Sequence, residues 1–333
     1  MRVRCASIAA CSSALLIGFV HAQSARDFLP SHLSGLAIWQ DASVLNLADG
    51  VKVSSWPASG GLAYGASQSD ETHQPTFHTG AINGRPAVRF GGDAANESLR
   101  ILANATTQAT YSDLGIGPAG ITYFAVLRAA QATDGALFGD DDNVGELRIS
   151  TSSIRLARHN FEGRVTMPGD YTHFVRLAGT FSTLDPNAAN ETAVYVDGVA
   201  SPTSTQLNST NAIAGLALNI GADVTDNLTR PHFGGDLAEL IIWNRRLSAT
   251  ELGQVDAYLQ NKYFTPHLTI EVSEVRLCWI SQSNKLYQLQ YRSELTTNAW
   301  LDLGAPILGT GGTNCITDPV VGPRRFYQAL VLP

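Results

Sequence analysis

Short runs of alternating apolar and polar residues, separated by glycine, asparagine, aspartate and proline, fill the chain from Gly35 to Phe264. Two runs, 121–128 and 237–243, are apolar at almost every position and are therefore predicted to be central strands. Asp197-Gly198 directly follows another run and is typical of a hairpin turn, because glycine accepts positive φ. Helices do not separate the runs, so an antiparallel all-β sandwich is favoured over a parallel sheet. The other expected strands are 35–39, 86–90, 145–150, 153–158, 173–178, 192–196 and 216–221.

One helix is predicted at the end of this region. Ser248 and Glu251 have the spacing of a capping box, in which each side chain accepts a hydrogen bond from the backbone N–H of the other residue. Apolar residues then recur at helical spacing and give the helix one buried face. These residues are Leu252, Val255 and Leu259. The helix is expected to end near Tyr263 and to pack on the sandwich.

A second, shorter region runs from His267 to Pro333. Thr265-Pro266 separates the two regions, because proline disfavours helix in the residue before it. Alternation at 275–280 and 286–291 predicts a small all-β module. A module of this size is marginal on its own hydrophobic core, which is a physical reason to expect a covalent link within it.

The first 22 residues have the three parts of a secretory signal peptide. Arg2 and Arg4 precede the apolar stretch 8–20, and Val20-His21-Ala22 fits a cleavage site. The stretch is too short for a membrane span, which needs roughly 20 apolar residues, and no second such stretch follows. We therefore expect a secreted or cell-surface protein without a membrane span, with residues 23–34 as a linker. A buried N-terminal helix is the alternative.

Cysteine use agrees with export. Cys5 and Cys11 leave with the signal, so the mature chain keeps Cys278 and Cys315. Two cysteines in an oxidising compartment favour one disulfide, and two free buried thiols are the alternative.

The composition argues against a nucleic-acid partner. The chain has 22 Lys and Arg against 29 Asp and Glu, and 15% of its residues are charged. Loss of Arg2 and Arg4 with the signal moves the net charge from −7 to −9. Without a basic run or stripe, the chain has no means of neutralising phosphates.

The run 235–248, with the helix after it, resembles the closing strand and helix of the laminin-G-like, concanavalin-A-like jelly rolls of bacterial exported proteins. Segments 35–43, 54–56, 74–77, 83–90 and 194–198 follow in the order of that family. The resemblance covers 35–264 and implies a jelly-roll domain.

Residues 267–333 are similar to small C-terminal β-sandwich modules of the fibronectin type III kind. The similarity rests on Cys278-Trp279, 284–291, Trp300, Cys315 and 324–327. It implies a spacer or attachment role for this module.

Jelly rolls of this superfamily include glycoside hydrolases, polysaccharide lyases and non-catalytic binders, so the fold does not decide the function. A retaining glycosidase needs two carboxyl groups about 5–5.5 Å apart, and on a strand these must stand two or four residues apart to share a face. Asp236 and Glu239 are three apart and are expected on opposite faces. This spacing argues against a hydrolase.

A lyase would need a tyrosine or histidine base and an arginine facing an acidic sugar. His159, His173, Arg148 and Arg176 lie on nearby predicted strands. The simpler interpretation is that they are polar residues on solvated strand faces. The negative charge of the mature chain also does not suit a polyanionic substrate.

The densest acidic loop, formed by Asp140, Asp141, Asp142 and Asn143, offers two or three oxygen ligands of the kind that Ca²⁺ takes. The resemblance also implies Ca²⁺ in a loop at the rim of the sheet. A solvated turn is the alternative.

The five tryptophans occupy positions typical of strands and core, where packing is their expected role. Three tyrosines lie in predicted loops instead and are candidates for contact with a ligand. They are Tyr64, Tyr111 and Tyr171.

These features favour an exported, two-domain, all-β protein that binds an extracellular polysaccharide or a surface protein without catalysis. Two other functions stay open: a polysaccharide-degrading enzyme, a lyase before a hydrolase, and a structural spacer.

Overall fold

The computed structural model describes residues 28–333 except 63, 118, 140–145, 159–161, 184–188, 203, 208–216, 223–230, 267–273, 295–298 and 320–324. The chain divides into two compact units, Met1–Pro266 and His267–Pro333. No helix among the described residues is long and apolar enough to cross a membrane.

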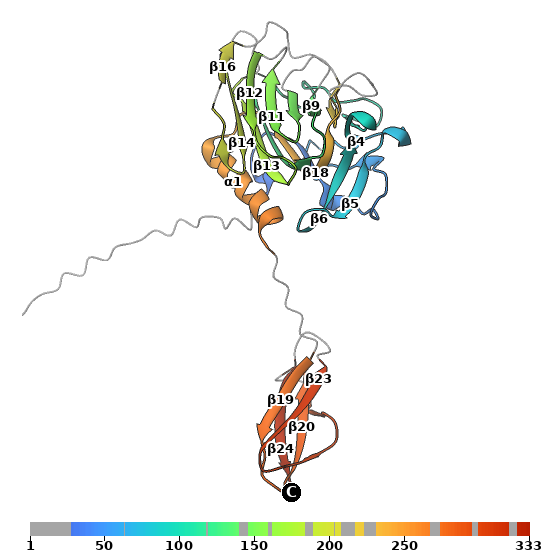
Figure 1. Ribbon diagram of the computed structural model, residues 1–333, viewed down its shortest axis with the longest axis vertical. Helices are drawn as coiled ribbons and strands as arrows, with labels where there is room; N and C mark the ends of the chain where they lie inside the picture. Colours follow the sequence, from blue (N-terminus) through green and yellow to red (C-terminus); the bar gives the residue numbers. More distant parts are fainter. Residues whose placement is uncertain are drawn as a thin grey trace, which may run out of the picture. The chain divides into compact units, whose positions relative to one another are not determined.

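The described residues of the first unit form two antiparallel sheets, in agreement with the predicted all-β jelly roll (Figure 1). Among the described residues, the ten-stranded sheet contains β15 (Val199–Ala200), β14 (Ala189–Val196), β13 (Val175–Phe181), β8 (Ile121–Ala129), β18 (Gly234–Trp243), β1 (Leu36–Asp41) and β3 (Gly60–Gly61) in that order. Beside these, β16 (Ser204–Leu207) pairs with β14, and β6 (Gly84–Gly91) pairs with β18 and β5 (Thr76–Gly80). The eight-stranded sheet runs β12 (Glu162–Pro168), β11 (Ser153–Arg158), β10 (Glu146–Ile149), β9 (Gly135–Gly139), β17 (Asn219–Ile220), β7 (Leu99–Ile101), β4 (Ala66–Ser67) and β2 (Ser55–Trp56).

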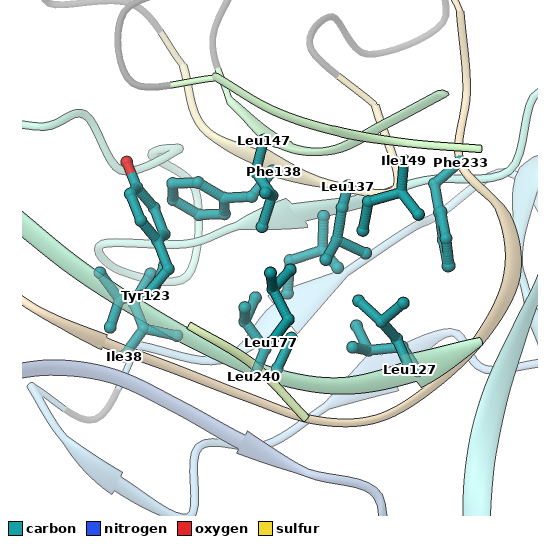
Figure 2. Packing of buried hydrophobic residues seen from close by; sticks show 14 of the residues in the cluster. Ile38, Tyr123, Leu127, Leu137, Phe138, Leu147, Ile149, Leu177, Phe233 and Leu240 are labelled. Atoms are coloured by element: carbon teal, nitrogen blue, oxygen red, sulfur yellow. The ribbon is translucent and has the colours of Figure 1, made fainter. Parts of the chain in front are cut away.

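The hydrophobic core lies between these sheets (Figure 2). Leu127 and Leu240 come from the central strands β8 and β18, which are apolar at most positions and lie in the middle of the sheet as predicted. Tyr123 of β8 meets Phe138 of β9 with ring centroids 5.7 Å apart. The alternation along each strand thus decides which residues join the two sheets.

The predicted helix covers the outer face of the ten-stranded sheet. α1 (Ala249–Leu259) continues into the π-helical turn η5 (Gln260–Phe264). The capping box is present: Ser248 Oγ accepts from the Glu251 N–H, and the Glu251 carboxylate accepts from the Ser248 N–H at 2.9 Å. A second apolar cluster joins the helix to the sheet through Val255, Leu259, Trp243 and others.

The cluster under the helix also includes Phe28, from the segment expected to be a linker. Phe28 is buried, and its ring meets that of Tyr258 of α1 edge-on. Pro30 begins a short 3₁₀ turn, η1 (Pro30–His32), and is buried too. Residues 28–34 therefore begin the folded unit rather than lead into it.

The described residues of the second unit form two small antiparallel sheets. One pairs β19 (Glu274–Ile280) with β23 (Thr313–Pro319), and the other contains β21 (Leu301–Asp302), β20 (Leu286–Arg292), β22 (Ile307–Leu308) and β24 (Phe326–Leu332). Cys278 and Cys315 stand directly opposite each other in β19 and β23 and form the predicted disulfide. Both cysteines are exposed, so the disulfide joins the strands on their solvent face.

Candidate functional site

The structure buries two of the three tyrosines that were expected to contact a ligand. Tyr111 is 0% exposed and packs edge-on against Phe138. Tyr171 is 2% exposed, and its hydroxyl donates to the Met167 carbonyl at 3.0 Å. Tyr64 is partly buried and donates to the Asp113 carbonyl at 3.2 Å. The prediction that all three rings face a ligand is therefore wrong for Tyr111 and Tyr171, because their loops fold back and add the rings to the core.

The acidic residues proposed as calcium ligands, Asp140, Asp141, Asp142 and Asn143, lie outside the described residues. In the part of the chain that is described, no three His, Cys, Asp or Glu side chains are grouped closely enough to hold a metal ion.

The residues considered for a lyase site are not brought together where the structure describes them. Arg148 is on β10 of the eight-stranded sheet, whereas Arg176 is on β13 of the other sheet. Arg176 lies under α1 and pairs with Asp256 at 2.8 Å. His173 is 63% exposed at its side chain, and its Nδ1 lies 3.9 Å from the Asp170 carboxylate. His159 lies outside the described residues.

Asp236 and Glu239 do share a face, contrary to the prediction from their spacing. Opposite β8, the register of β18 shifts between Leu237 and Glu239, which inserts Ala238 as a β-bulge. The extra residue of a bulge shifts the alternation by one position, so two residues that are three apart across the bulge point to the same face. Both carboxylates therefore point to the outer, helix-covered side of the ten-stranded sheet.

Each of these carboxylates is engaged by cationic side chains. Asp236 accepts from Arg89 Nε at 2.7 Å and from Arg128 Nε at 2.6 Å. Glu239 and Asp41, which are directly opposite in β18 and β1, accept from the same Lys262 amine at 2.7 and 2.6 Å. We call Lys262, Glu239 and Asp41 the Lys262 cluster.

The Lys262 cluster is an internal connection between the end of the helix and the sheet. Glu239 is fully buried, and it also accepts from Trp39 Nε1 at 2.7 Å and from the Tyr258 hydroxyl at 3.0 Å. Burial raises the pKa of Glu239, while the charge of Lys262 opposes that rise. Because solvent does not reach the carboxylate, the cluster holds η5 in place rather than meeting a substrate.

A different set of polar side chains lies on the outer face of the eight-stranded sheet. Leu147, Ile149, Ile154 and Leu156 point into the core, so the residues between them on β10 and β11 point outward. On β7, Arg100 likewise stands between two core residues. The outward residues include Arg100, Arg148 and Arg155, which we call the arginine face.

Arg148 and Arg155 are direct cross-strand neighbours. The side chain of Arg155 is 13% exposed, and its Nη1 lies 3.1 Å from the Asp134 carboxylate. Arg100 is separated from Arg148 by β17 and β9, or about 14 Å at the usual spacing of strands. Opposite Arg100, the Asn219 side chain accepts from Gln108. Guanidinium and amide groups held in this way can bind oxygen atoms through several directional hydrogen bonds.

Sequence reasoning noticed Arg148 and missed Arg100 and Arg155. The available signal was the alternation of arginine with core residues in 99–101 and 153–158. The sequence contained no comparable signal for the order of the strands, which places β7 and β10 in one sheet with these arginines on the same face.

Comparison with known proteins places the first unit among jelly rolls. Residues 102–253 match the family described as the concanavalin A-like lectin/glucanases superfamily. No curated protein sequence matches the chain.

Several solved structures are similar at low sequence identity. The CBM40 of the Ruminococcus gnavus IT-sialidase, bound to α2,3-sialyllactose, is 13% identical over 51% of this chain and 95% of its own, with a TM-score of 0.39. The binding domain of Paraclostridial Mosquitocidal Protein 1 is 11% identical over 76% of this chain and 60% of its own, with a TM-score of 0.41. The receptor-binding domain of botulinum neurotoxin C/D mosaic serotype is 9% identical over 81% and 68%, with a TM-score of 0.42. The family match over residues 102–253 and the two packed antiparallel sheets support a concanavalin A-like lectin/glucanase superfamily domain in the first unit.

Proposed function

We propose that this protein is exported and binds extracellular carbohydrate, without catalysis, through the arginine face of its jelly roll. The observation that carries the proposal is the direct cross-strand pairing of Arg148 with Arg155. This register sets two guanidinium groups side by side on the outer face of the sheet, and the Asp134 carboxylate holds one of them in place. Two neighbouring guanidinium groups can together contact several oxygen atoms of one ligand.

The chemistry of the face suits a glycan. A guanidinium group presents several N–H donors in a fixed plane, which fits the carboxylate or neighbouring oxygens of a sugar. The chain as a whole is acidic, so a few arginines on one face favour a discrete contact over a long polyanion. The outer face of the ten-stranded sheet is largely packed under α1, which leaves the eight-stranded sheet as the better candidate for a large ligand.

Non-catalytic binding is favoured over a hydrolase or a lyase by the state of the ionisable groups. The carboxylates of Asp236, Glu239 and Asp41 are all engaged by arginine or lysine. Arg148 and Arg176, the arginines considered for a lyase site, lie on different sheets and do not converge on one site. A catalytic site would require convergence, because a general acid or base must lie within reach of the proton that it transfers.

The test is affinity electrophoresis of residues 23–333 in gels that contain plant, algal or microbial polysaccharides. We expect retardation in at least one gel without a cleared zone in the stained polysaccharide. Arg148→Ala should reduce that retardation at least fivefold, as expected for one charge-assisted contact. Arg276→Ala removes an exposed arginine of the second unit and should leave the retardation of the protein unchanged.

The other outcomes count against the proposal. A cleared zone would indicate an enzyme, and equal retardation of the wild type and Arg148→Ala would exclude the arginine face as the site. No retardation in any gel would favour a protein partner or a spacer role. Export is tested separately: N-terminal sequencing of the protein secreted by its host should begin at Gln23.

A further inference from the structure

We infer that the jelly roll has a second binding site, a cleft between α1 and the outer face of the ten-stranded sheet, for a small ligand that combines an apolar ring with a protonated amine. The cleft has a volume of about 280 Å³. Phe124 and Ala178 line it from the sheet, Tyr195 from β14, and Leu252 and Gly253 from the helix. It lies on the opposite sheet from the arginine face, so the inference does not rest on the proposed function.

Small residues keep this cleft open. Gly253 is in the interior of α1, where glycine costs roughly 1 kcal/mol relative to alanine. A Cβ at Gly253 would meet no atom within 4 Å, so packing does not require a glycine here. Ala178 and Ala249 add little volume on either side. The sequence thus leaves a space beside the helix that larger apolar side chains would have filled.

Aromatic and aliphatic side chains make the walls suitable for a ring. Phe124 is buried under the cleft, whereas Tyr195 is partly buried and packs at the edge of the apolar cluster below the helix. Leu252 also packs on that cluster from the helix side. A dry apolar cavity of about 150 Å³ can hold benzene, so this cleft has room for a ring with a short side chain.

The charge beside the cleft favours a cation. The Arg176 guanidinium, which also lines the cleft, lies 2.8 Å from the Asp256 carboxylate and 3.3 Å from that of Asp197. These three side chains together carry a net charge of −1, and Asp197 is not one of the lining residues. Asp256, 29% exposed at its side chain, lines the cleft and can accept from a ligand amine. Attraction between a cation and the Tyr195 ring would add to this preference.

The probes are three small molecules that share a ring and differ in charge: 2-phenylethylamine, 2-phenylethanol and phenylacetate. We would titrate each into residues 23–333 by calorimetry. The amine should bind at least tenfold more tightly than the alcohol, and phenylacetate should bind most weakly. Equal affinity for amine and alcohol would refute the charge argument, and no binding of the amine would overturn the site.

Gly253→Leu tests the location, because the new side chain fills the cleft. We expect at least a tenfold loss of affinity for the amine, with a helical signal and melting temperature no lower than those of the wild type, since leucine is the better helix former. Gln254→Leu adds the same side chain at an exposed neighbouring position outside the cleft and should bind as the wild type does. Unchanged binding in Gly253→Leu would place the ligand elsewhere. Arg148→Ala should not affect binding of the amine, which separates this site from the arginine face.

Discussion

From the geometry of the Lys262 cluster we predict how a substitution there changes the free energy of unfolding of the first unit. Lys262→Met keeps most of the apolar stem of the side chain but removes the amine that Glu239 and Asp41 share. Truncating one partner of a buried ion pair typically costs 3–5 kcal/mol, because it leaves an uncompensated charge. Trp39 and Tyr258 still donate to Glu239 in the variant. We therefore expect a loss of roughly 3 kcal/mol at pH 7, at the lower end of that range.

The loss should depend on pH in a direction set by Glu239. Burial raises the pKa of Glu239 in the folded protein above its ordinary value, and removal of the lysine charge should raise that pKa further. A carboxyl with a raised folded pKa favours folding when it is protonated, and this contribution is lost as pH rises through the folded pKa. The deficit of Lys262→Met should therefore be largest at pH 7 and shrink toward pH 4.5.

Urea unfolding at pH 7 and pH 5, followed by tryptophan fluorescence, measures this deficit. The two units can unfold separately, so the transition of the first unit must be fitted on its own. Lys285→Met removes an exposed lysine of the second unit and should change the first transition by less than about 0.5 kcal/mol. A loss below about 1 kcal/mol for Lys262→Met, or a loss that grows toward low pH, would refute the reasoning.

Three further predictions concern separate parts of the chain. Replacing Cys278 and Cys315 together by serine should destabilise the second unit by roughly 3–4 kcal/mol, because the disulfide closes a loop with a sequence separation of 37 residues; a normal urea midpoint for that unit would contradict this. Ser248→Ala should cost about 1 kcal/mol by removing the helix cap, whereas Ser248→Asp should retain most of the stability in the same thermal melts. If residues Asp140–Asn143 bind Ca²⁺, calorimetry should detect binding that Asp141→Ala weakens at least tenfold, and a wild type that binds no Ca²⁺ would refute the site.

Local features of this protein were readable from the sequence. Ser248 and Glu251 are three residues apart, so the capping box depends only on neighbouring backbone. Period-two alternation marked the strands, because side chains of a strand point to its two faces in turn. The pairing of Cys278 with Cys315 followed from their number, since the sequence after the predicted signal peptide offers one partner for each.

Tertiary structure decided everything that depends on contacts between distant segments. The bulge at Ala238 reversed the expected orientation of Glu239, because register is set by pairing with β8 and not by spacing along β18. Tyr111 entered the core when its loop folded onto the sheet. The arginine face likewise depends on the order of the strands, and the cleft beside Gly253 depends on where α1 packs on the sheet. Periodicity states which residues share a face of one element, but only packing determines which elements bring their faces together.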